Sequence, residues 1–255
     1  MLSPITWLRK STVFILFFLI SHVTFALHYS YEKNESDKQI THIIVLNPKN
    51  YEIELVRANN NSGRETVLAI ANRYKADIAI NGGFFGKDGM PSGSLIINGH
   101  VYHIKNMKQA LLIKKNKTLS ILQANPTKYV TDNVSIVSGI PLLINQGQLS
   151  RELKNKKSDF YLGQHARTAL GIKSNGLIVI VVAEQSVEMK GLTILELAQL
   201  MKKLGCQYAI NLDGGGSSTL FIHGKVVNQP MGDMDEGNGQ LTIRPVSDAI
   251  IFKEI

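Results

Sequence analysis

The stretch TILELAQLMKKLGCQYAINLDGGGSST (residues 193–219) combines a helix pattern, a strand pattern and a glycine-rich turn. Its first half places apolar residues on one helical stripe, and Thr193 and Glu196 have the spacing of a capping box. Gly205 is the expected end of this helix, and an apolar strand pattern follows it. The strand ends at Asp213, which precedes three glycines and three hydroxyl side chains. Because a glycine run is entropically costly to order, we expect this turn to do more than reverse the chain.

Outward from this stretch, the chain has the pattern of many short strands and few helices. A second helical pattern covers ETVLAIANRY (65–74). Strand patterns are found at 40–47, 51–58, 76–81, 93–99, 109–115, 119–124, 140–147, 168–173 and 177–184. No linker-like stretch divides residues 40–255. We therefore predict a single domain of α+β (mixed α/β) class, with a mixed β-sheet core and packed helices.

The N-terminus has the pattern of a targeting segment. Arg9 and Lys10 precede a short apolar run, and the small residue Ala26 follows it, so residues 1–26 are predicted to be a signal peptide. An uncleaved anchor is the alternative, but the run is short for a membrane span of about 20 residues. Residues 27–39 are expected to form a loose polar tail. We thus expect an exported protein, periplasmic or secreted, with no stable membrane span after cleavage.

Charge and cysteine content limit the partners. The chain has 28 basic and 20 acidic residues, and its lysines are scattered. They are explained either as solvated surface or as a field that attracts anions such as phosphorylated glycans. No nucleic-acid signature is present, so nucleic acid is not an expected partner. The single cysteine, Cys206, allows no internal disulfide, which fits the bacterial cell envelope.

The glycine turn predicts a ligand site. Without side chains at Gly214, Gly215 and Gly216, a ligand can approach the backbone, and successive N–H groups can converge on an anion. The hydroxyls of Ser217 and Ser218 add donors. A carboxylate before such a turn suits acid–base or nucleophilic chemistry. The alternative is a tight turn in which the carboxylate caps its own backbone.

Other motifs around this turn are incomplete. A P-loop needs a lysine after the glycines, and none is present. A nucleophile elbow needs glycine where Thr219 stands. In the segment DMDEGNGQL, Asn238 replaces the glycine that a calcium loop requires. The histidines are scattered, so we expect no metal and no other cofactor.

A second strand repeats the pattern before the glycine run. The sequence Ala-Ile-Asn occurs at 79–81 and at 209–211, and each copy precedes glycine. If the two strands are neighbours, Asn81 and Asn211 mark one sheet edge where ligands commonly bind. Chance similarity of two buried strands is the alternative.

Two further charged residues are candidates for the same site. Arg167, in GQHARTALGI, has the bidentate donors that bind phosphate, although a surface salt bridge explains it as well. Glu184 ends an apolar strand pattern, either as a second carboxylate of the cleft or as a solvated strand end.

Five stretches resemble the phosphodiester glycosidase family and occur in the same order. They are INGGFF (80–85), SGIPLLINQG (138–147), ARTALGI (166–172), residues 193–220 and RPVSDAIIF (244–252). The likeness extends over residues 40–253. It implies hydrolysis of a sugar-1-phosphodiester, such as an N-acetylglucosamine-1-phosphodiester, in a domain covering residues 40–255.

The combined hypothesis assigns roles to the candidate residues. Asp213 would act as base or nucleophile at the anomeric carbon, while Arg167 and the glycine amides hold the phosphate. The catalytic candidates are Asp213, Arg167 and Glu184. The candidate substrate-binding residues are Asn81, Gly82, Gly83, His165, Thr168, Asn211, Gly214, Gly215, Gly216, Ser217 and Ser218.

Two other functions remain open at this point. One is a non-catalytic binder of anionic envelope glycans that uses the same groove. The other is a serine hydrolase with Ser217 or Ser218 as nucleophile and His223 as base.

Overall fold

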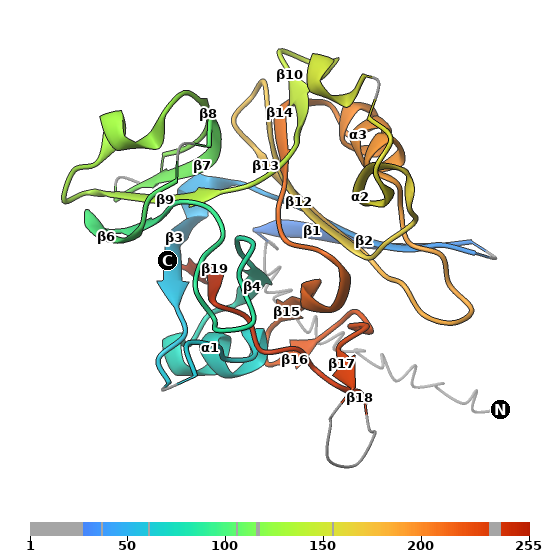
Figure 1. Ribbon diagram of the computed structural model, residues 1–255, viewed down its shortest axis with the longest axis horizontal. Coiled ribbons are helices and arrows are strands. Elements are labelled where there is room, and N and C mark those ends of the chain that lie inside the picture. Colours follow the sequence, from blue (N-terminus) through green and yellow to red (C-terminus); the bar gives the residue numbers. More distant parts are fainter. Residues whose placement is uncertain are drawn as a thin grey trace, which may run out of the picture.

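The computed structural model describes residues 28–36, 38–60, 62–105, 107–115, 118–154, 156–234 and 241–255 (Figure 1). The predicted signal peptide lies outside the described residues. Three large sheets and one two-stranded ribbon make up most of the fold. Within the described residues, no helix has the length and apolar character needed to cross a membrane.

The largest sheet has seven strands. In spatial order they are β1 (Tyr29–Glu35), β2 (Ile40–Leu46), β13 (Ile178–Ala183), β12 (Arg167–Lys173), β14 (Cys206–Asn211), β10 (Leu142–Asn145) and β11 (Gln148–Leu149). Helix α3 (Ile194–Lys203) packs against it beside the short α2 (Asp159–Leu162). The α3 capping box is confirmed: Glu196 N donates to Thr193 Oγ1 at 3.1 Å, and Thr193 N donates to Glu196 Oε2 at 2.7 Å.

A five-stranded sheet lies next to it. Its order is β16 (Lys225–Val226), β15 (Leu220–Ile222), β4 (Ile78–Asn81), β19 (Asp248–Glu254) and β3 (Tyr51–Arg57). Helix α1 (Val67–Tyr74) covers one face, where Ile70 and Ala71 pack with Phe221 and Ile251. This packing fixes the position of β4, the strand that carries the Ala-Ile-Asn sequence at 79–81.

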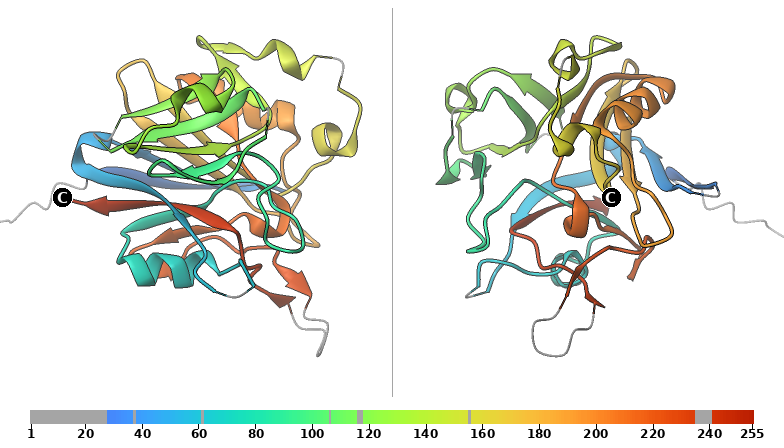
Figure 2. Two further views of the ribbon diagram at one scale, coloured as in Figure 1. Left: turned by 60° about the vertical axis from the view of Figure 1, so that its left-hand side comes forward. Right: turned by 45° about the vertical axis from the view of Figure 1, so that its right-hand side comes forward.

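The third sheet, green in Figure 2, lies beside the other two. It contains β6 (His100–His103), β5 (Leu95–Ile97), β9 (Val134–Ser138), β7 (Gln109–Lys114) and β8 (Leu119–Gln123). The ribbon pairs β17 (Asp233–Met234) with β18 (Leu241–Thr242), and the 3-10 helices are η1 (Pro48–Asn50), η2 (Pro126–Tyr129), η3 (Arg151–Leu153) and η4 (Gly215–Ser217). All three large sheets contribute to one apolar core, for example through Ile180, Ile250 and Leu111.

The structure refines two expectations about the fold. Sheets dominate over helices, so the class is α+β. The strand pairs of the three large sheets are antiparallel rather than mixed. The prediction of a loose polar tail at 27–39 is wrong for Tyr29–Glu35, because this segment is a strand that pairs with β2 along its whole length. The segment is polar because it forms the exposed outer strand of the sheet, where charged side chains are common.

Candidate active site

The site forms where two strands from different sheets end side by side. The two Ala-Ile-Asn strands, β4 and β14, belong to different sheets, so the condition that they are neighbours in one sheet is not met. Their carboxyl ends nevertheless meet: Asp213 N donates to Gly82 O at 3.1 Å, and Asn81 Nδ2 donates to Asp213 O at 2.7 Å. In Figure 1 the turn that follows β14 lies between the two sheets.

Asn81 is the polar centre of this junction. Its side chain is fully buried, and its Oδ1 accepts from Thr168 Oγ1 at 2.8 Å and from Thr219 N at 3.3 Å. Asn81 and Thr168 thus connect three chain segments. Asn211 donates from Nδ2 to Ile140 O at 2.6 Å, while its buried Oδ1 has no hydrogen-bond partner among the described residues.

The Asp213 carboxylate is held in a partly buried position. Burial raises the pKa of Asp213 to about 6, against the opposing effects of the Ser217 hydroxyl, the Gly214 amide and the charge of Arg244. Among the described residues, the Gly214 amide makes a well-formed hydrogen bond with the carboxylate, at 3.0 Å from Oδ1. A raised carboxyl pKa in a cleft is typical of catalytic acids and bases.

A second carboxylate, Asp248, lies nearby and was not predicted. It is 1% exposed, and it accepts from Gly83 N at 2.8 Å and from Ser247 Oγ at 2.9 Å. Burial raises its pKa to about 6, and the charge of Asp213 adds to this shift. A side chain at Gly82 would overlap the Asp248 carboxylate. Gly82 and Gly83 therefore allow the backbone to pack closely against the Asp248 carboxylate. The only sequence signal for Asp248 was its place in the stretch RPVSDAIIF.

The three glycines of the turn are required for three different reasons. A Cβ at Gly214 would lie 2.7 Å from Ala166 O, and one at Gly216 would lie 2.6 Å from Arg244 Cζ. Gly215 has open space around it but a φ of +56°, which only glycine adopts readily.

Most of the turn's amides are used within the protein. Gly214 N donates to Asp213 Oδ1, and Gly215 N donates to Ala166 O at 2.8 Å. Ser217 N donates to Gly214 O at 3.1 Å. At least two of the three glycine amides are therefore engaged within the protein and do not converge on an anion.

A basic cleft opens in front of Asp213. Its volume is about 620 Å³, and it is lined by Arg64, Phe85, Gly86, Lys87, Asp213, Asp233 and Arg244. Arg64 has a buried Nε with no hydrogen-bond partner among the described residues. Arg64, Lys87 and Arg244 thus line the same cleft as the Asp213 carboxylate, an arrangement suited to an anionic ligand.

Arg244 is already paired within the chain. Its Nε and Nη2 both donate to Asp233 Oδ1, at 2.7 and 2.6 Å. The pair is partly exposed, which allows a ligand anion to reach the guanidinium. The sequence reasoning assigned no role to these three cations. Arg64 and Lys87 carry no motif, and the only signal for Arg244 was its place at the start of the stretch RPVSDAIIF.

Arg167 lies outside this cleft lining. Its guanidinium is buried and donates to Leu192 O at 2.8 Å, Phe160 O at 2.8 Å and Gly163 O at 3.0 Å. Burial lowers the pKa of Arg167 to about 10, which leaves it charged at neutral pH. Its contacts are those of a residue that holds loops together behind the glycine turn.

Glu184 and His165 also lie away from the cleft lining. Glu184 Oε1 accepts from His42 Nε2 at 2.6 Å and from Gln229 N at 2.8 Å. Burial alone would raise the pKa of Glu184, but these two hydrogen bonds outweigh it and the pKa lies below the usual value. His165 pairs with Asp159 at 2.8 Å.

The serine-hydrolase arrangement is not formed. The hydroxyls of Ser217 and Ser218 are buried and have no hydrogen-bond partner among the described residues. Strand β15, roughly 10 Å long at about 3.3 Å per residue, lies between these serines and His223. His223 lies against Asp77.

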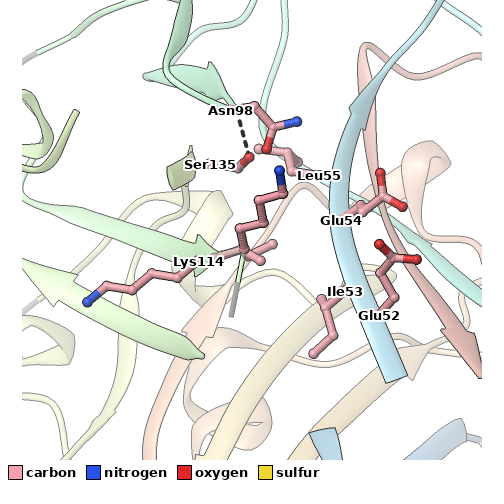
Figure 3. Close-up of a pocket in the computed structure, with 9 residues that line it drawn as sticks. Glu52, Ile53, Glu54, Leu55, Asn98, Lys114 and Ser135 are labelled. Carbon is pink, nitrogen blue, oxygen red and sulfur yellow. Dashed lines mark hydrogen bonds between the residues drawn. The ribbon is translucent and has the colours of Figure 1, made fainter. Parts of the chain in front are cut away.

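Other possible sites are separate from Asp213. A small pocket between β3 and the third sheet holds Glu52 and Glu54 on one side and Lys114 on the other (Figure 3). No group of three His, Cys, Asp or Glu side chains that could hold a metal ion occurs in the described part of the chain. Much of the segment with the calcium-loop likeness, including Asn238, lies outside that part.

Comparison with known proteins identifies related chains. The family described as phosphodiester glycosidase matches residues 74–253. N-acetylglucosamine-1-phosphodiester alpha-N-acetylglucosaminidase from Homo sapiens is 29% identical over 187 residues, and the mouse enzyme (Mus musculus) is 27% identical over 184 residues. The alignments cover 66% of this chain but 36% of each relative. The chain thus corresponds to about a third of the length of these enzymes.

Solved structures show the same fold. The catalytic domain of the zebrafish N-acetylglucosamine-1-phosphodiester alpha-N-acetylglucosaminidase, auto-inhibited by its pro-peptide, gives a TM-score of 0.75 at 21% identity, with 91% of this chain and 85% of that chain covered. A Burkholderia pseudomallei protein described as a candidate exported protein gives a TM-score of 0.62 at 15% identity, with 84% and 74% covered.

The contacts of Glu184 predict a structural effect of its removal. The variant Glu184→Gln should lower the free energy of unfolding by about 1.5–3 kcal/mol at pH 7, because a charged hydrogen bond to buried His42 is lost. The difference should shrink as the pH falls through the lowered pKa of Glu184, where the wild-type carboxylate is protonated. Urea titrations of both proteins measure this, with exposed Glu35→Gln as the control. Unchanged stability would contradict the structural role.

The geometry of the turn predicts different effects at adjacent glycines. Gly216→Ala should weaken binding of inorganic phosphate at least about tenfold and also lower stability, because its Cβ would lie 2.5 Å from the backbone oxygen of Gly232 and 2.6 Å from Arg244 Cζ. Gly215→Ala should retain binding but cost about 1–2 kcal/mol of stability, because of its positive φ. Calorimetric titration and thermal unfolding separate the two effects. Equal phosphate affinity in both variants would show that the cleft does not depend on close approach at Gly216.

Proposed function

The chain belongs to the phosphodiester glycosidase family, and we propose that it hydrolyses the glycosidic bond of a sugar-1-phosphodiester in the cell envelope. One observation supports this proposal above all. Asp213, whose carboxyl pKa is raised, lines the same cleft as three cationic side chains. An N-acetylglucosamine-1-phosphodiester is the substrate class that the named relatives support.

The phosphate is placed by the cations of the cleft. Arg244, Arg64 and Lys87 offer positive charge along the lining of the cleft. Donors aimed at a developing charge are worth about 3–4 kcal/mol each in favourable cases. This assignment replaces Arg167 as the direct phosphate ligand and gives it a positioning role, since its guanidinium donates to three carbonyls.

Asp213 acts at the anomeric carbon as base or nucleophile. In the first role it removes a proton from the attacking water, and in the second it forms a covalent glycosyl ester that water then hydrolyses. The glycosidic C–O bond breaks in both cases, and its electron pair leaves with the phosphate. A phosphate monoester is a good leaving group, so protonation of the leaving oxygen contributes less than in ordinary glycosides.

A binder without catalysis would use the same cations, but Asp213 argues against it. A buried carboxylate beside the anion site repels a bound phosphate, and its burial costs stability. A protein that only bound phosphorylated glycans would gain from an uncharged residue at this position. A catalytic role for Asp213 explains why a carboxylate occupies this position despite that cost.

Removal of the carboxylate charge should abolish turnover. Asp213→Asn should lower kcat by at least about 10³-fold on a panel of sugar-1-phosphodiesters, because the base or nucleophile is lost. Its stability at pH 7 should equal or exceed that of wild type, since a group with a raised pKa costs stability once it is ionised. Exposed Asp132→Asn is the matched control. A folded Asp213→Asn protein with near-normal turnover would refute the catalytic assignment.

The raised pKa predicts the pH dependence of activity. The value of kcat/KM should rise about tenfold per pH unit below pH 6 and level off above it, because the ionised form of Asp213 is the active one. Asp248 shares this range and is coupled to Asp213, so the profile reports the pair. Initial rates from pH 4 to 8 measure the curve. Activity that is constant down to pH 4.5 would exclude a carboxylate of raised pKa as the base.

Isotope labelling separates attack at carbon from attack at phosphorus. Hydrolysis in ¹⁸O-water should place the label on the anomeric oxygen of the released sugar, analysed before exchange by mutarotation. The released phosphomonoester should carry none. Label in the phosphate would make the enzyme a phosphodiesterase.

A further inference from the structure

A second polar pocket lies beside the cleft, at the end of strand β3. It has a volume of about 400 Å³, and its polar lining includes Arg57, Asn59, Asn60, Ser62 and Asp88. We refer to it as the Arg57 pocket. The proposed reaction makes no use of it.

The pocket and the cleft lie at the same edge of the five-stranded sheet. In register, β19 pairs Asp248 with Arg57 on one side and Ala249 with Asn81 on the other. Strands β3 and β4 are therefore two strand spacings apart, so Arg57 lies roughly 10 Å from Asn81 at about 4.8 Å per spacing. A ligand of a few sugar units can span this distance.

The same two loops line both sites. The end of β3 contributes Arg57 to the pocket, and the loop after it contributes Asn59 to the pocket and Arg64 to the cleft. The loop after β4 contributes Asp88 to the pocket and Lys87 to the cleft. The loops touch at Gly63 and Gly89, where a Cβ on Gly89 would lie 2.9 Å from Gly63 O. The phosphate-binding cations Arg64 and Lys87 are thus placed between Asp213 and the Arg57 pocket.

Arg57 carries a donor that the described part of the protein leaves unused. Its Nε is buried without a hydrogen-bond partner among the described residues, and its Cζ lies 4.8 Å from the ring centroid of Tyr102. Stacking fixes the guanidinium plane, and a buried donor without a partner is unfavourable. A ligand oxygen would supply the missing acceptor.

The chemistry of the lining favours a sugar over a second phosphate. Asp88 would repel an anion, whereas the hydroxyls of a sugar can donate to a carboxylate and accept from a guanidinium. Asn59, Asn60 and Ser62 add mixed donors and acceptors. Met90, 45% exposed at the pocket, provides apolar surface for a sugar ring.

We propose that the Arg57 pocket is a second sugar subsite, which binds a sugar of the leaving group one unit removed from the reacting phosphodiester. The natural substrate is then a phosphodiester to an oligosaccharide rather than to a single sugar. The inference rests on the proposed function for the bond that is cleaved, and the pocket itself is a separate binding site.

The test compares leaving groups of different length. One sugar-1-phosphodiester is prepared with a monosaccharide and with a disaccharide leaving group, and kcat/KM is measured for both. Wild type should prefer the disaccharide at least about tenfold, and in Arg57→Gln this ratio should fall to near one. The ratio cancels any effect of Arg57 on Asp248 that both substrates share. Arg151→Gln, an exposed arginine in η3, should keep the wild-type ratio.

A binding measurement keeps the two proposals apart. The phosphomonoester of the same disaccharide, the expected product, is titrated into wild type, Arg57→Gln and Arg57→Lys by calorimetry, with thermal unfolding to verify folding. Both variants should bind at least about fivefold more weakly, because neither places a guanidinium Nε in the pocket. If both variants bind the product more weakly but wild type hydrolyses none of the diesters, the proposed function is refuted and the sugar subsite is still supported. Turnover with the same leaving-group ratio in wild type and Arg57→Gln would overturn the subsite.

Discussion

The backbone hydrogen bond from Asp213 N to Gly82 O joins the ends of two sheets, and the site depends on it. Strand β14 belongs to the seven-stranded sheet and β4 to the five-stranded sheet, so each alone would leave its terminal polar groups without partners. Asn81 completes the junction by donating to Asp213 O and accepting from Thr168. Because all of these groups are buried, loss of one partner would leave others unsatisfied at a cost of about 1–3 kcal/mol each. The carboxylate is held at the junction of two packed sheets.

This junction explains how far the sequence could be interpreted. The local signals were reliable: the capping box of α3 and the strand patterns both depend on neighbouring residues. The repeated Ala-Ile-Asn pattern correctly pointed to two strand ends that meet, although they meet between sheets. The resemblance to the family, carried by the same motifs, is confirmed.

What the sequence could not show is which long-range partners line the cleft with Asp213. Arg64, Lys87 and Arg244 reach one cleft from three loops, and no spacing rule connects residues so far apart in the chain. Arg167 had the right chemistry and a suggestive position, but its guanidinium is directed at backbone carbonyls. Asp248 is hidden for a similar reason, since only the register of β19 against β3 and β4 brings it beside Gly82 and Gly83.

The charges of the cleft suit the proposed reaction because their sum need not change as it proceeds. Three cations line the same cleft as Asp213 and Asp233, which leaves one positive charge in excess, and a bound phosphodiester carries one negative charge to match it. As the glycosidic bond breaks, the phosphate gains a second negative charge. At the same step Asp213 loses its own, whether it takes a proton from water or forms a bond to the sugar. Negative charge moves from the carboxylate toward Arg244 and its neighbours, in a partly buried site where such a transfer is poorly screened by water. Fixed cations on the receiving side therefore stabilise the transition state more than the bound substrate, which is the condition for catalysis rather than simple binding.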